Sequence, residues 1–197
     1  MSTIIKESLS KSTSYDEYRK KVSNLLKEGK STGPIQTADL LNYSTLNDAR
    51  MNRLDKKTTL TDATVEALKK TKEKQTWLLI TEGWCGDAAQ IAPVINRMSV
   101  ESDKVDLKVV LRDENENLMN QFLTNGTKSI PKLVVLNAND EVISSWGPRP
   151  SLATKMVNDY KISHGGIDAN FKKELQIWYN KNKGESIQED LVAFLEK

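Results

Sequence analysis

Hydrophobic residues recur at helical spacing through the first 75 residues of the chain. Ser14 is a candidate N-cap and Gly29 a candidate stop for a first helix, whose apolar face would hold Tyr15, Tyr18, Val22, Leu25 and Leu26. A second helix is predicted from apolar residues at helix-compatible spacings, namely Leu40, Leu41, Tyr43, Leu46 and Met51. A short third one begins at Thr61 or Asp62. We therefore expect residues 1–75 to form an N-terminal helical extension packed on the core.

The pattern changes at residue 76, where short apolar runs replace the helical period. Four runs predict strands: TWLLIT from residue 76, VDLKVVLRD from residue 105, KLVVLN from residue 132 and NDEVISSW from residue 139. Helical segments separate the first three runs, so the order is strand, helix, strand, helix and then a hairpin. This order predicts an α/β core over residues 76–150, with a mixed sheet that combines parallel crossovers with one antiparallel pair.

After Pro150 the helical period returns in three segments, SLATKMVNDYKIS, ANFKKELQIWYNKNKG and SIQEDLVAFLEK. Ser186 and Glu189 have the spacing of a capping box at the start of the last one. We expect residues 151–197 to be helices that complete the same domain. The Trp178-Tyr179 pair is interpreted as packing rather than as a ligand platform.

Composition excludes several classes of protein. The 197 residues are 38% hydrophobic and 28% charged, with a net charge of +2, which is typical of a folded globular chain. No stretch reaches the roughly 18 apolar residues of a membrane span, and the basic residues are dispersed among acids, so we expect neither membrane nor nucleic-acid binding. One cysteine and one histidine leave no metal cluster. We expect no cofactor and a cytoplasmic location.

The only cysteine, Cys85, lies in the segment TEGWCGDAAQIAP, between a predicted strand and a predicted helix. Unpaired backbone N–H groups and the helix dipole stabilise a thiolate at a helix N-terminus. Asp87 opposes this effect unless its side chain caps the helix. Ala88 occupies the position of the second cysteine of a dithiol site, so an outside thiol would have to resolve any mixed disulfide on Cys85.

Several residues, in order, resemble the thioredoxin-like superfamily. Trp84-Cys85-Gly86-Asp87-Ala88 resembles its Trp-Cys-Gly-Pro-Cys motif, and Pro93 matches its helix-kinking proline. Ser129-Ile130-Pro131-Lys132-Leu133 resembles the segment that carries its cis-proline, and Gly147 resembles a glycine that lines its site. The phrases TEGWCGDAAQ, LRDEN, LTNG, SIPKL and WGPRP are also similar to a bacterial branch that has WCGDA in place of WCGPC. The resemblance implies a thioredoxin-like three-layer α/β/α fold with a mixed central sheet and helical extensions at both ends.

The resemblance also implies a site. It makes Cys85 the reacting residue and surrounds it with Trp84, Gly86, Asp87, Ile130, Pro131, Gly147 and Arg149, and it implies a cis Ile130–Pro131 bond facing the sulfur. Arg149, in the WGPRP loop, would then offset the repulsion from Asp87. The family usually buries an acid six residues before its first cysteine, but Leu79 stands there; Glu82 is nearer and would have to point inward. Arg112 and Asp113 either line the site or form a surface ion pair.

Two functions remain open. In the first, which we prefer as an expectation, Cys85 carries out monothiol thiol–disulfide exchange in cell redox homeostasis, with a protein or low-molecular-weight thiol as partner and the backbone near Pro131 pairing with that partner. In the second, the chain is a redox-inactive module that binds a peptide or protein with Trp84, Ile130 and the WGPRP loop. The retained cysteine favours the first, and the missing second cysteine and buried acid favour the second.

Overall fold

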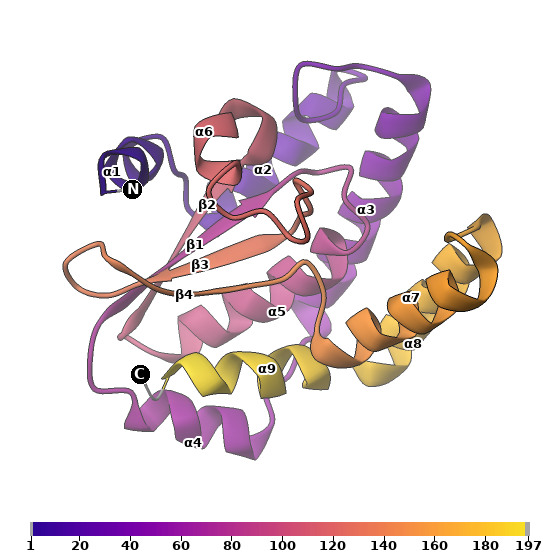
Figure 1. Ribbon diagram of the computed structural model, residues 1–197. Helices are drawn as coiled ribbons and strands as arrows, with labels where there is room; N and C mark the ends of the chain where they lie inside the picture. Colours follow the sequence, from indigo (N-terminus) through magenta and orange to yellow (C-terminus); the bar gives the residue numbers. More distant parts are fainter. Residues whose placement is uncertain (1, 196–197) are drawn as a thin grey trace.

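Residues 2–195, which the computed structural model describes, contain a four-stranded sheet with helices on both faces (Figure 1). The strands are β1 (Gln75–Thr81), β2 (Val105–Leu111), β3 (Lys132–Leu136) and β4 (Val142–Trp146), and their order in the sheet is β2-β1-β3-β4. β1 pairs with β2 in parallel, while the pairs β1–β3 and β3–β4 are antiparallel. The predicted α/β fold with a mixed sheet is confirmed.

The prediction of one antiparallel pair is wrong, because the second connection does not cross the sheet. A parallel crossover needs a helix long enough to carry the chain back along the strand. Between β2 and β3 the chain forms only a 3-10 turn (Arg112–Glu114) and the four-residue helix α6 (Glu116–Met119). The chain therefore enters β3 at the same end of the strands at which it leaves β2, and β3 runs antiparallel to β1.

The central strands β1 and β3 are buried on both faces, as continuous apolar runs predict. Side chains of β1 alternate between two hydrophobic clusters: Trp77 and Leu79 belong to one, Leu78 and Ile80 to the other. The sheet therefore separates two hydrophobic cores, one on each of its faces.

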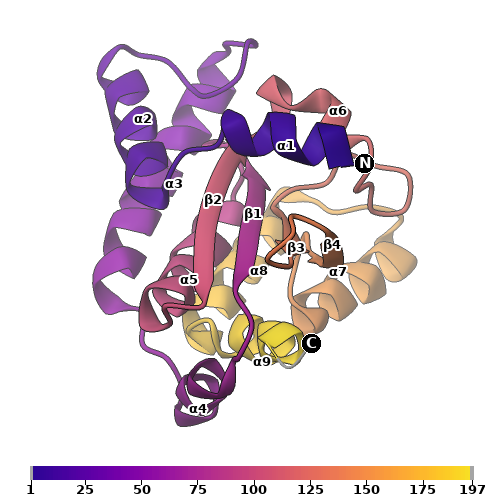
Figure 2. The same cartoon turned by 90° about the vertical axis from the view of Figure 1, so that its left-hand side faces the viewer.

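Helices of the first 75 residues and of the last 47 cover much of the sheet. The N-terminal helices are α1 (Ser2–Ser10), α2 (Tyr15–Lys27), α3 (Ala38–Lys57) and α4 (Asp62–Lys70). The first crossover is α5 (Ala88–Glu101), which contains Pro93, and the C-terminal helices are α7 (Ser151–His164), α8 (Ala169–Asn182) and α9 (Glu185–Leu195). Figures 1 and 2 show α1 and α6 on one face of the sheet and α5 with α9 on the other.

Polar side chains cap several of these helices. Ser14 and Glu17 form a reciprocal capping box at α2, and the side chains of Thr37 and Thr61 accept backbone N–H groups at α3 and α4. The capping box predicted at Ser186 is wrong: α9 begins one residue earlier, and Ser186 is buried and hydrogen-bonded to the side chain of Asn182 instead.

Helix α3 departs from the predicted burial pattern. Of its predicted apolar face only Met51 is buried, whereas Tyr43 and Leu46 are 49% and 54% exposed. The inward positions belong to Ser44, whose hydroxyl lies 2.6 Å from that of Ser31, and to Asn47. The desolvation of these buried polar groups costs little free energy because each of them is hydrogen-bonded.

Candidate functional site

Cys85 lies in the turn between β1 and α5, with its side chain in contact with the loop before β3. Its backbone N–H donates to the carbonyl of Glu82 at 3.2 Å. Its thiol donates to the carbonyl of Ile130 at 3.3 Å, and the N–H of Ala88 donates to Sγ at 3.5 Å. The residue is only 9% exposed. The sulfur therefore sits at the N-terminus of α5, as predicted, but it is almost covered.

Burial is the main influence on the pKa of the Cys85 thiol. Burial raises the pKa of Cys85 to about 12, and the neighbouring Asp87 carboxylate adds to the rise. The backbone N–H groups of Ala88 and Asp87 and the charge of Arg149 act in the opposite direction without reversing it. The direction of this shift favours the protonated thiol, so burial and Asp87 outweigh the stabilisation of a thiolate by the helix N-terminus.

Asp87 is held by two residues that lie far from it in sequence. Arg149 donates through Nη2 to Oδ2 at 2.7 Å, and the Tyr179 hydroxyl donates to Oδ1 at 3.0 Å. The Asp87 side chain makes no capping hydrogen bond to α5 and is 11% exposed. Burial raises the pKa of Asp87, while Arg149 and Tyr179 favour the carboxylate. Tyr179, interpreted from the sequence as a packing residue, is thus part of this site.

The loops that carry Pro131 and Gly147 lie against each other. The Ile130–Pro131 bond is cis, and so is Gly147–Pro148. Gly147 has φ +112°, and a Cβ atom placed there would lie 2.4 Å from the carbonyl oxygen of Pro131. Only glycine fits this backbone and this close approach. The contact brings the Arg149 loop within reach of Asp87.

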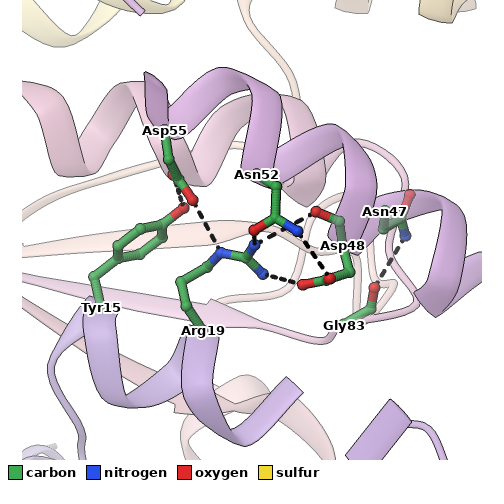
Figure 3. Close-up of polar contacts among 7 residues, drawn as sticks. All are labelled: Tyr15, Arg19, Asn47, Asp48, Asn52, Asp55 and Gly83. Atoms are coloured by element: carbon green, nitrogen blue, oxygen red, sulfur yellow. Dashed lines mark hydrogen bonds and ion pairs between the residues drawn. The ribbon is translucent and has the colours of Figure 1, made fainter. Parts of the chain in front are cut away.

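The peptide of Gly83, two residues before Cys85, is hydrogen-bonded on both sides by the N-terminal extension. Its N–H donates to Oγ1 of Thr32 at 2.9 Å, and its carbonyl accepts from Nδ2 of Asn47 at 3.0 Å. We call this pair of bonds the Gly83 clamp. Figure 3 shows Asn47 on α3 pointing toward Gly83. Neither Thr32 nor Asn47 was predicted from the sequence.

A charged network fixes α3, and with it the Gly83 clamp, against α2. Arg19 of α2 donates to Asp48 at 2.8 Å, to Asp55 at 3.1 Å and to the side chain of Asn52 at 2.8 Å (Figure 3). The Tyr15 hydroxyl donates to Asp55 at 2.7 Å. One guanidinium group therefore binds three side chains spaced about one turn apart along α3, and its fork geometry suits several acceptors.

Glu82 and Arg112 occupy the far side of the turn. Glu82 is fully buried and accepts the N–H of Asp113 at 3.0 Å, so it points inward; burial raises its pKa. Leu79 is also fully buried, within the core. Arg112 bonds to Asp113 at 2.7 Å and lies over the ring of Trp84, 4.8 Å from its centroid. The Arg112–Asp113 pair is thus both an ion pair and a neighbour of the site.

A groove of about 390 Å³ opens beside Cys85, between α3 and α8. Its lining includes Trp84, Cys85, Gly86, Asp87 and Arg149 of the predicted site. The apolar walls come from helices that the sequence did not assign to a site: Leu40, Tyr43 and Leu46 of α3, Phe171 and Leu175 of α8, and Ile167 before it. Its size and apolar walls are typical of a ligand pocket.

The structure places the predicted residues in two groups. Trp84, Gly86, Asp87 and Arg149 line the groove. Ile130, Pro131 and Gly147 do not line it: the Ile130 carbonyl accepts the Cys85 thiol, and Gly147 lies against Pro131. The side chain of Ile130 is buried in the core cluster that contains Leu78 and Ile80 and does not line this groove, so its role in gripping a partner stays a prediction. Within residues 2–195 no group of three or more acidic, histidine or cysteine side chains is arranged to hold a metal, and no helix has the length and hydrophobicity to span a membrane.

Comparisons with known proteins agree with this fold. A family model described as Thioredoxin matches residues 33–161, a range that already includes α3. A protein of unknown function from Pseudomonas aeruginosa has a similar structure, with 16% identity, a TM-score of 0.61, and coverage of 93% of this chain and 98% of its own. An HIV epitope-scaffold has 17% identity, a TM-score of 0.59 and the same two coverages.

Identities this low show a shared fold and nothing about activity. No curated protein matches the chain. The family model, however, matches more than half of the 197 residues, and the residues it spans include the Cys85 turn, the Pro131 loop and Arg149. The chain therefore belongs to the thioredoxin family.

Proposed function

We propose that this protein is a thioredoxin-fold binding module that holds a peptide segment of a partner protein in the groove between α3 and α8, with Cys85 as a protonated thiol in the groove wall. The observation that carries the proposal is the groove itself. Its walls are largely apolar, and two of the side chains that line it, Tyr43 and Leu46, are about half exposed. Exposed apolar side chains that line one concavity are typical of interaction sites.

The state of the thiol supports binding over redox chemistry. A pKa of about 12 leaves a fraction on the order of 10⁻⁵ of Cys85 as thiolate at pH 7, and the thiolate is the nucleophile. Asp87 stays beside the sulfur, and Ala88 fills the position of a resolving cysteine. One free thiol and no disulfide suit a reducing compartment, so we further propose a cytoplasmic location.

Monothiol exchange is the second candidate, favoured by two contacts. The Ala88 N–H points at Sγ, and Cys85 is part of the groove lining, so a bound disulfide would lie next to the sulfur. In this reaction the Cys85 thiolate attacks one sulfur of the partner disulfide, forms a mixed disulfide and releases the other sulfur as a thiolate. An external thiol such as glutathione then attacks the mixed disulfide, which frees Cys85.

Alkylation of native Cys85 by iodoacetamide separates the two candidates. For the binding module we expect a rate at pH 7 about 10³-fold below that of the urea-unfolded chain, rising about tenfold per pH unit up to at least pH 10. Because both forms have the same single thiol, the unfolded chain is the internal control. A plateau below pH 8, together with a mixed disulfide that Cys85→Ser cannot form, would establish exchange instead.

Binding is tested with peptides selected from a random 12-residue phage-displayed library. Selected peptides should lose binding to Leu46→Asp, which places a charge in the groove wall, and keep binding to Cys85→Ser. Val100→Asp is the matched control, because Val100 is 70% exposed on α5 and does not line the groove. Peptides that bind Leu46→Asp as well as wild type would place the binding surface elsewhere and contradict the proposal.

A further inference from the structure

The groove carries more positive than negative charge. Three basic residues line it, Arg50, Arg149 and Lys172, and Asp87 is the only acidic residue in its lining. Both carboxylate oxygens of Asp87 are already engaged, one by Arg149 and the other by the Tyr179 hydroxyl. Within residues 2–195 neither Arg50 nor Lys172 forms an ion pair. The groove therefore contains two basic side chains, those of Arg50 and Lys172, that are not paired with an acidic side chain of the described residues.

Arg50 is the better placed of the two cations. Its Nη1 donates to Oδ1 of Asn47 at 2.7 Å, and Asn47 is itself fixed by its hydrogen bond to Gly83. The same Nη1 lies 4.0 Å from the position a Cβ atom would take on Gly86, so the guanidinium lies against the turn next to Cys85. Lys172 is exposed on the first turn of α8 and lacks such support.

The Arg50 guanidinium is held in one orientation by Asn47, and this hydrogen bond involves only part of its N–H donors. It has five N–H donors, and its hydrogen bond to Asn47 uses one of them. Burial and repulsion from Arg53 lower the pKa of Arg50, and attraction to Asp87 opposes this effect. A half-buried cation of this kind gains when an anion reaches it, since a charge-assisted hydrogen bond replaces incomplete solvation.

We infer that the groove recognises a peptide segment that carries a carboxylate among apolar side chains, with Arg50 binding the carboxylate and the apolar wall of α3 and α8 packing against its neighbours. This inference rests on the proposed function, since it names the chemical class of the bound segment. It needs no reaction at Cys85. Leu40, Tyr43 and Leu46 lie on the same helix as Arg50, so one short segment can reach both kinds of contact.

The test uses two peptides that differ in a single side chain, fluoresceinyl-Leu-Leu-Glu-Leu-Leu-amide and its Gln counterpart, with fluorescence anisotropy as the readout. Wild type should bind the Glu peptide about tenfold more tightly than the Gln peptide. Arg50→Gln should reduce this ratio to about one. Arg50→Lys, which keeps the charge but loses the planar fork, should give an intermediate ratio.

Arg53→Gln is the matched control, because it removes the same charge one turn further along α3. Arg53 does not line the groove and donates instead to the side chain of Asn180 at 2.7 Å. The ratio of the two affinities should persist in this variant. A ratio near one in wild type, or an equal loss in Arg50→Gln and Arg53→Gln, would overturn the inference.

Leu46→Asp distinguishes failure of the inference from failure of the proposed function. If both peptides bind wild type equally and both are lost in Leu46→Asp, the groove binds peptides but does not read a carboxylate. If neither peptide binds wild type, and no library peptide depends on Leu46, the binding function itself is wrong.

Discussion

The two faces of α3 reverse the usual distribution of polar and apolar residues. The face toward the core carries Ser44 and Asn47 next to Met51, while Tyr43 and Leu46 face outward. In an ordinary surface helix the apolar stripe packs on the core. Here the inward face forms specific hydrogen bonds to Ser31 and Gly83, and the outward face forms the wall of a groove.

The difference shows that α3 does two separate tasks. Its inward side chains are satisfied pairwise and hold the backbone near Cys85, which a purely apolar face could not do because it would offer no donors. Its outward side chains contribute little to folding and remain accessible to a partner. Substitutions on the outward face should therefore change binding with little effect on stability, whereas substitutions on the inward face should lower stability. Asn47→Ala should also weaken binding, because Asn47 holds Arg50 of the groove.

The largest expected effect belongs to the inward face. Met51→Ala should lower the free energy of unfolding by about 2–5 kcal/mol, because it leaves a cavity in the core. Leu46→Ala, on the outward face, should change it by less than about 0.5 kcal/mol. Urea unfolding measures both, and equal losses in the two variants would remove the contrast between the faces.

Loss of the Gly83 clamp should have the next largest effect. Asn47→Ala should lower the free energy of unfolding by about 1–3 kcal/mol, because it leaves the buried Gly83 carbonyl without its donor. It should also speed alkylation of Cys85, since the turn becomes freer to open. Tyr43→Ala serves as the control on the opposite face, and a similar alkylation rate in both variants would show that Asn47 does not hold the turn.

Burial of Cys85 by this turn should be visible in the pH dependence of stability. The unfolded thiol loses its proton near about 8.5, whereas the native thiol has a pKa of about 12. Between these values the native state binds the extra proton, so stability falls as pH rises. From pH 8 to 9.5 wild type should lose about 1 kcal/mol more than Cys85→Ala. Parallel pH profiles of the two proteins would mean that the native thiol titrates normally.

The smallest change in stability is expected from polar substitutions on the outward face. Tyr43→Ser combined with Leu46→Ser should shift the free energy of unfolding by about 0.5 kcal/mol or less, because these side chains already contact water. The same variant should no longer bind groove-dependent peptides. A large loss of stability would show that the wall is part of the core.

The Cys85 turn and the loops around it could be predicted because short sequence motifs mark them. Cys85, Pro131, Gly147 and Arg149 stand in short motifs, and the fold brings these motifs to one place. The short α6 could not be predicted, since the apolar residues of ENENLMNQFLTNG fit a full helix as well as a turn.

The rest of the site depends on contacts between distant segments. Asn47 and Thr32 are polar residues in a helix and a loop, and a sequence pattern assigns such residues to the solvent. Only the fold shows that Gly83 needs both of them. Tyr179 likewise gives no local sign of its bond to Asp87, 92 positions away. The groove walls were missed because apolar residues at helical spacing predict a core face.

The Gly83 clamp has a consequence for protein engineering. A graft that transplanted only residues 76–150 into another scaffold would carry the cysteine, the proline loop and Arg149, but it would leave behind the Thr32 and Asn47 side chains that shape the turn. The grafted segment would contain the motif but not the two side chains that hold the Gly83 peptide in place. A transferable unit has to start no later than residue 32.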